Sequence, residues 1–163
     1  MVNNAGINRV NKFCEIPDVD IDEILQVNLV APIKIMRHVL PHMISQSWGR
    51  IVNLGSIFSK VSKEYRAVYS ASKFGIDGIT ASASAEFSRQ GVLVNTISPG
   101  FIATELTEKV LGEAGMKSIV NTVPIGRLGQ ANEVAELVGW LVSSKNTFVT
   151  GQNVLIDGGF TRV

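Results

Sequence analysis

The sequence is poor in cysteine and histidine, which limits the chemistry the chain can carry. It has one cysteine among 163 residues, Cys14, so no disulfide can form within the chain. We therefore expect a reducing, cytoplasmic location. No histidine neighbours Cys14, which favours an inert thiol. His38 and His42 have the spacing of a metal-binding helical face, but they lack the glutamate of a zinc protease and a third ligand. No metal is expected.

Strong charge and long apolar runs are also missing. The net charge is +1, with 18% charged and 45% hydrophobic residues, as in a soluble globular protein. No basic run favours binding to nucleic acid, and no acidic tail indicates a disordered arm. The longest apolar runs, such as 51–54 and 91–97, are too short to cross a membrane. Polar Asn3 and Asn4 near the start indicate no secretory leader. We expect one domain over residues 1–163.

Short β-branched runs alternate with helical patterns along the chain. The periods predict helices at 20–47, 69–89 and 130–142, and strands at 50–55, 91–97 and 153–156. Strands joined by helices of this length form right-handed units around a parallel sheet, so an α/β layered fold is expected. Residues 101–123 have no clear period and predict short helices that cover the site as a lid.

The first predicted helix contains a proline at position 32. Pro32 has no N–H, so the carbonyl of Asn28, four residues earlier, loses its helical partner. A distortion there would place a backbone carbonyl and an amide side chain together, as an anchor for water or cofactor. A tolerated kink is the alternative.

Tyr69 and Lys73 form the most informative pair. They are four residues apart and therefore share one face of a helix. A nearby ammonium lowers the pKa of a phenol, so Tyr69 could give a proton to an alkoxide or take one from an alcohol. Ser56 directly follows a predicted strand, at the sheet edge where α/β proteins bind ligands. Its hydroxyl could hold the reacting oxygen.

The helix that begins at Tyr69 is rich in small residues. These are Ala71, Ser72, Gly75, Gly78, Ala81, Ser82, Ala83, Ser84 and Ala85. Small side chains allow another helix to approach closely. The partner could be a helix of the same chain or one of a second copy.

Several short motifs, in this order and spacing, resemble the short-chain dehydrogenase/reductase family. They are Asn3-Asn4-Ala5-Gly6, Asn28, Ser56, Tyr69 with Lys73, Pro99-Gly100 and Asp157-Gly158-Gly159. The resemblance covers essentially the whole chain. It is strongest to classical members close to the 3-oxoacyl-acyl-carrier-protein reductases.

The resemblance implies a role for each matching residue. Tyr69 would be the general acid/base, and Lys73 would lower its pKa and hold the nicotinamide ribose. Ser56 would bind the substrate carbonyl, and Asn28 would anchor a water of a proton relay. The implied cofactor is NAD or NADP, which Tyr69 and Lys73 would also contact. Its adenosine side would be lined by Asn4, Ala5 and Gly6. Its nicotinamide and the neighbouring phosphate would meet Pro99, Gly100, Ile102 and Thr104. The implied reaction moves a hydride between this cofactor and a small carbonyl or secondary alcohol.

One part of the family pattern is absent from this sequence. A full member has a glycine-rich turn that binds the cofactor pyrophosphate at a helix N-terminus, and no such turn occurs here. The resemblance therefore implies the C-terminal part of a Rossmann-like, doubly wound, three-layer α/β/α fold, without its first βαβ unit. We expect weakened cofactor binding and an exposed edge on the strand at 50–55.

Two functions remain open from the sequence. The first is an NAD(P)-dependent oxidoreductase that forms dimers or tetramers through its two long helices. The alternative is an inactive homologue that acts as an oligomerisation or interaction module.

Overall fold

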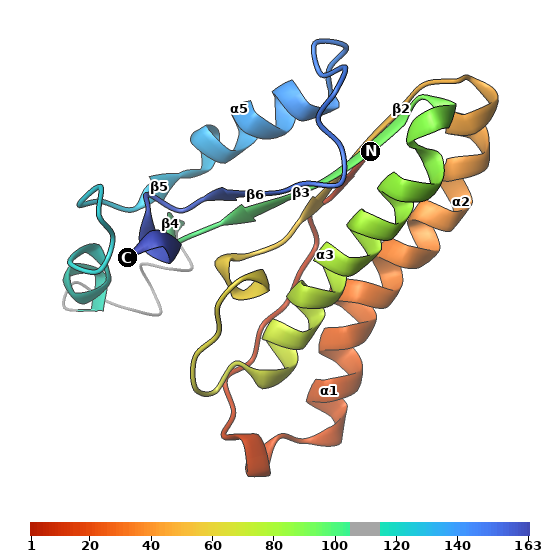
Figure 1. Ribbon diagram of the computed structural model, residues 1–163. Coiled ribbons are helices and arrows are strands. Elements are labelled where there is room, and N and C mark those ends of the chain that lie inside the picture. Colours follow the sequence, from red (N-terminus) through yellow and green to blue (C-terminus); the bar gives the residue numbers. More distant parts are fainter. Residues whose placement is uncertain (105–114) are drawn as a thin grey trace.

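The computed structural model describes residues 1–104 and 115–163 (Figure 1). Its centre is a parallel sheet of four strands in the order β1-β2-β3-β6. The strands are β1 (Val2–Asn3), β2 (Gly49–Leu54), β3 (Val92–Pro99) and β6 (Asn153–Ile156). The helices are α1 (Asp18–Leu25), α2 (Ala31–Ser45), α3 (Ala67–Phe87) and α5 (Ala131–Val142). A separate parallel pair joins β4 (Ile102–Ala103) to β5 (Gly129–Gln130).

Helices cover both faces of this sheet (Figure 1). Successive side chains of a strand point to opposite faces. Ile51 of β2 therefore packs with Met36 of α2 and Ala83 of α3, whereas its neighbour Val52 packs with Leu141 of α5. This arrangement confirms the predicted three-layer α/β/α fold. The predicted strands and the two later helices lie within a few residues of their observed positions.

The expectation of an exposed edge on the strand at 50–55 is wrong, because β1 pairs with this strand. Val2 and Asn3 lie opposite Val52 and Asn53 in parallel register. The amino group of Met1 donates to the carbonyl of Arg50 at 2.7 Å. In the described part of the chain, the edge strand on this side of the sheet is therefore β1, which has only two residues.

The helix predicted at 20–47 is broken where Pro32 was expected to distort it. A π-helical turn, Gln26–Val30, separates α1 from α2, and Pro32 lies in the first turn of α2. Such turns widen the helix locally and are frequent at functional sites. The turn carries the buried Asn28.

The lid predicted at 101–123 lies partly outside the described residues. Its described part comprises β4 and a helical segment at 115–120. Within the described ranges, no helix is long and apolar enough to span a bilayer.

Candidate active site

The predicted catalytic residues Ser56, Tyr69 and Lys73 meet at the carboxyl end of β2. Ser56 lies two residues beyond this strand. The buried amine of Lys73 donates to the carbonyl of Leu54, the last residue of β2, at 2.8 Å. This bond fixes the first turns of α3, and with them Tyr69, against the sheet edge.

Tyr69 is held by two neighbours from the segment after β2. The Ser56 side chain forms a hydrogen bond with the phenol. The ring of Phe58 meets the Tyr69 ring edge to face, with centroids 6.1 Å apart and planes at 78°. Ser56 is itself oriented, because its Oγ accepts a hydrogen bond from the backbone N–H of Phe58 at 3.3 Å. The hydroxyl and the phenol therefore lie side by side.

The pKa of Tyr69 is raised, which is opposite to the lowering expected from Lys73. Burial raises the pKa of Tyr69, and this outweighs the lowering by the Ser56 hydrogen bond and by the charge of Arg66. Burial also lowers the pKa of Lys73, to about 8. The Lys73 amine lies 5.7 Å from the centre of the Tyr69 ring. Both charged forms lose hydration in this site, so Tyr69 stays protonated and is ready to act as a proton donor.

Asn28 fastens the segment after β1 to helix α3. Its side chain is 1% exposed. The Oδ1 atom accepts from the N–H of Ile7 at 2.8 Å, and Nδ2 donates to the carbonyl of Ile7 at 2.8 Å. Nδ2 also donates to the hydroxyl of Ser72, next to Lys73, at 3.1 Å. The side-chain amide thus acts as a clamp, and its role as a water anchor stays a prediction.

The segment that Asn28 fastens passes directly beside Lys73. A Cβ added to Gly6 would lie 3.5 Å from Asn28 Oδ1 and 3.6 Å from Lys73 Nζ. Because Gly6 has no side chain, the amine of Lys73 can be reached from the side of residues 4–6. Asn4, Ala5 and Gly6 are all exposed. Cofactor binding by residues 4–6 stays a prediction.

The second predicted cofactor segment lies at the same edge of the sheet. Pro99 ends β3, and Gly100 follows it. Adjacent parallel strands end at one edge, so this segment and residues 4–6 flank the end of β2. Ile102 is half-buried in β4, and Thr104 is exposed. Gly100 also has a packing role, since a Cβ there would lie 2.8 Å from the Cα of Asp157.

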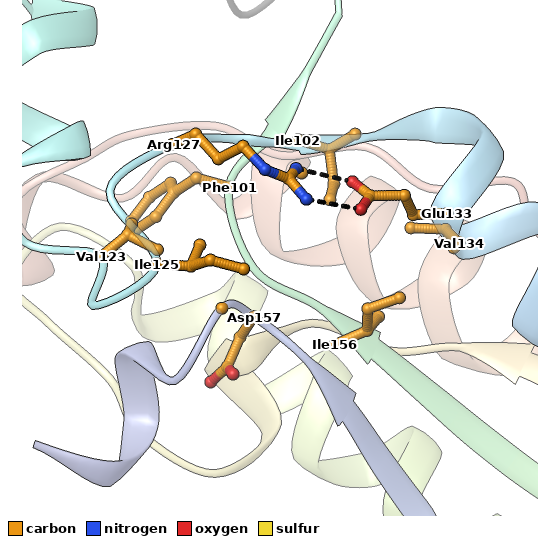
Figure 2. A pocket seen from close by; sticks show the side chains of 11 residues that line it. Phe101, Ile102, Val123, Ile125, Arg127, Glu133, Val134, Ile156 and Asp157 are labelled. Carbon is orange, nitrogen blue, oxygen red and sulfur yellow. Dashed lines mark hydrogen bonds and ion pairs between the residues drawn. The ribbon is translucent and has the colours of Figure 1, made fainter.

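A small cavity beyond Gly100 was not predicted from the sequence. It has a volume of about 140 Å³ and lies between β4, β6 and the start of α5 (Figure 2). Arg127 and Glu133 face each other at this cavity in a two-bond ion pair, with N–O distances of 2.9 and 2.7 Å. This pair holds the pKa of Glu133 at about 2. The charged groups are satisfied by each other, so the cavity offers mainly apolar surface.

Arg66 is the second feature that sequence reasoning missed. Its Nε and Nη1 atoms are buried without a hydrogen-bond partner. It lies three residues before Tyr69, and its charge acts on the phenol. The sequence does show a cation three residues before Tyr69, but the family motif does not include this position.

Comparisons with known proteins agree with this geometry. The family model described as enoyl-(acyl carrier protein) reductase matches residues 1–161. The 3-oxoacyl-acyl-carrier-protein reductase FabG of Pseudomonas aeruginosa is 36% identical over 159 residues, covering 98% of this chain and 64% of its own length. The chain therefore spans a little under two thirds of this relative.

Two solved structures have the same arrangement of elements. Gluconate 5-dehydrogenase of Burkholderia cenocepacia, in complex with NADP and tartrate, is 32% identical with a TM-score of 0.94, covering 99% of this chain and 64% of that one. A 4-hydroxyisoleucine dehydrogenase complexed with NADH is 33% identical with a TM-score of 0.93, covering 99% and 68%. The chain belongs to the short-chain dehydrogenase/reductase family.

Proposed function

We propose that this chain carries the catalytic and nicotinamide-binding part of an NAD(P)-dependent oxidoreductase that acts on a carbonyl or a secondary alcohol. The observation that supports it is the convergence of Ser56, Tyr69 and the buried Lys73 at the carboxyl end of β2. A hydroxyl, a protonated phenol and an amine at one sheet edge are suited to proton transfer to a carbonyl oxygen.

For the direction of reduction, from carbonyl to alcohol, each residue has a separate role. Ser56 donates a hydrogen bond to the substrate carbonyl and holds it beside Tyr69. Tyr69 gives its phenolic proton to the carbonyl oxygen as negative charge develops there. Lys73 binds the ribose hydroxyls of the cofactor and so holds the nicotinamide beside Tyr69. When bound, the reduced nicotinamide supplies the hydride to the carbonyl carbon.

The relatives define the range of substrates to be tested. They are named as a 3-oxoacyl-acyl-carrier-protein reductase, a gluconate 5-dehydrogenase and a 4-hydroxyisoleucine dehydrogenase. All three interconvert a carbonyl and a hydroxyl group. The two structures contain NADP and NADH respectively, so both cofactors belong in the assay.

Our first prediction concerns Tyr69→Phe, which removes the phenolic proton. Oxidation of millimolar NADPH or NADH by the chain should fall by about 10²–10⁴-fold with each carbonyl substrate that is reduced. Ser56→Ala, which removes the neighbouring hydroxyl, should also lower the rate of cofactor oxidation. Circular dichroism of both variants checks the fold. Equal, nonzero rates for the wild type and Tyr69→Phe would contradict the mechanism.

We further propose that two copies of the chain associate through α2 and α3. An exposed row on α3 repeats at intervals of three and four residues and consists of Ala71, Phe74, Gly78, Ala81 and Ala85. Phe74 in this row is 47% exposed. An apolar groove of about 430 Å³ lies between α2 and α3. Small residues in a row let the same helix of a second copy approach closely around a two-fold axis.

The second prediction tests this association. Ala81→Arg puts a long charged side chain into the row and should convert dimers or tetramers into monomers in analytical ultracentrifugation. The matched control is Ala135→Arg on α5, which is also an exposed helical alanine and should leave the mass unchanged. If the wild type is a monomer at all concentrations, the association is refuted. An associating chain without reductase activity would support the alternative, an interaction module.

A further inference from the structure

Arg66 stands out among the cations of the described residues. Arg9, Lys60 and Arg127 each pair with a carboxylate. Arg66 forms no ion pair within the described ranges, and its Nε and Nη1 atoms are buried without a hydrogen-bond partner. Buried guanidinium groups in folded proteins are normally paired, because the loss of hydration is otherwise uncompensated. A group that completes these hydrogen bonds would therefore bind favourably.

The position of Arg66 connects it to the reacting groups. It directly precedes α3, three residues before Tyr69, and its charge acts on the phenol. Tyr65, the residue before it, has a φ of 67°, a left-handed conformation that bulky side chains rarely adopt. Tyr65 is 48% exposed, whereas two guanidinium nitrogens of Arg66 are buried. The side chain of Tyr65 therefore reaches solvent, whereas Arg66 is half-buried and its charge acts on the Tyr69 phenol.

We propose that Arg66 binds a carboxylate of the substrate, so that the compound reduced beside Tyr69 is an oxo acid and the product a hydroxy acid. This inference rests on the proposed function, because it takes the reacting carbonyl to lie at Ser56 and Tyr69. The planar, permanently charged guanidinium is well suited to carboxylate oxygens. Arg66 takes no part in the bond changes: the carbonyl carbon gains the hydride, and its oxygen gains the proton of Tyr69.

Electrostatics connects carboxylate binding to the proton transfer. The positive charge of Arg66 favours the phenolate of Tyr69 and so opposes the protonated form that reduction requires. A carboxylate bound to Arg66 offsets this charge and keeps the phenol protonated. A neutral substrate would leave the buried guanidinium unpaired, and the site would discriminate against it.

The test compares acids with their uncharged counterparts. Pyruvate, acetoacetate and 4-oxopentanoate place the carboxylate at increasing distance from the carbonyl, and the methyl ester of each is its neutral control. Reduction is followed as NADPH or NADH oxidation by the wild-type chain, Arg66→Gln, Arg66→Lys and Lys63→Gln. Lys63 is an exposed cation of the same loop and controls for general charge effects. Melting temperatures confirm that each variant is folded.

The expected result is a preference of the wild type for at least one acid over its ester. Arg66→Gln should lower kcat/KM for that acid by about tenfold to a hundredfold, mainly through KM, with no loss for the ester. Arg66→Lys should restore part of the loss, and Lys63→Gln should behave like the wild type. Equal use of acids and esters by the wild type would overturn the inference. So would an equal loss for both in Arg66→Gln.

A binding measurement separates this inference from the proposed function. If no carbonyl compound is reduced, the proposed function fails. Calorimetric titration with 4-oxopentanoate then tests carboxylate binding by Arg66, which does not require reduction to occur. Saturable heat in the wild type that is absent from Arg66→Gln supports carboxylate binding, whereas no difference between the two refutes it.

Discussion

At the scale of single residues, Lys73 shows a conflict between stability and function. Its amine is 4% exposed and donates to one carbonyl, that of Leu54. No described carboxylate pairs with it. Burial lowers its pKa from 10.5 to about 8, and this difference corresponds to about 3 kcal/mol of lost stability while the amine is charged. A site that binds ribose hydroxyls can retain such a group despite this cost.

The third prediction follows from this pKa and concerns Lys73→Met. At pH 7 the variant should be more stable than the wild type by about 2 kcal/mol, because the buried charge is removed while the carbonyl of Leu54 loses its partner. Between pH 8 and pH 10.5 the unfolded wild type binds a proton at Lys73 that the folded wild type has lost. Its free energy of unfolding therefore rises with pH in this window.

Urea denaturation of both proteins at pH 7 and pH 10 checks the prediction. The advantage of Lys73→Met should shrink by about 2 kcal/mol between the two values, since methionine does not titrate. Tyr69 is present in both proteins, so its own titration largely cancels. A methionine variant that is less stable than the wild type at pH 7, by an amount that does not depend on pH, would refute the account.

At the scale of elements, the π-helical turn Gln26–Val30 positions the site. It brings the Asn28 side chain to the backbone of Ile7 and to Ser72 of α3. This one amide thereby holds together the loop after β1, the π-helical turn and α3. The loop over Lys73 depends on it for its backbone hydrogen bonds.

The fourth prediction tests this clamp with Asn28→Ala. The variant should lose about 2–3 kcal/mol of stability, because the buried backbone groups of Ile7 are left without partners. Asn8→Ala is the matched control, since Asn8 is an exposed amide in the same segment. It should change stability by less than about 0.5 kcal/mol. Hydrogen exchange at the Ile7 amide should speed up only in Asn28→Ala, and unchanged protection there would exclude the clamp.

Much of this arrangement was predictable because it depends on local patterns. The period of apolar residues placed the strands and helices, and Pro32 alone indicated the break near Asn28. The i, i+4 spacing placed Tyr69 and Lys73 on one face of α3. The partners of Asn28 were not predictable, since Ile7 and Ser72 lie 21 and 44 residues away. The direction of the Tyr69 pKa also depends on burial, which a spacing pattern does not contain.

At the scale of the whole molecule, the chain contains the residues expected to contact the nicotinamide end of the cofactor, but not the turn expected to hold its pyrophosphate. Residues 4–6, Lys73 and the segment after β3 lie at one sheet edge, where we expect the cofactor to bind. The glycine-rich turn that holds the pyrophosphate in full-length members is absent from this sequence. The relatives that contain bound NADP or NADH are longer, and the chain covers 64% and 68% of them.

The fifth prediction is that NADPH and NADH bind weakly to this chain. The two phosphates carry most of the charge of the cofactor core, and the sequence has no glycine-rich turn of the kind that binds them at a helix N-terminus. Calorimetric titration should therefore show no saturation below about 1 mM, the upper end of usual KM values.

The residual binding should come from the ribose, so Lys73→Met should weaken it further. Nicotinamide mononucleotide should bind almost as well as the dinucleotide, because both present the same end to Lys73. If NADPH instead binds tightly and saturably, and nicotinamide mononucleotide binds much more weakly, other residues of this chain must hold the pyrophosphate.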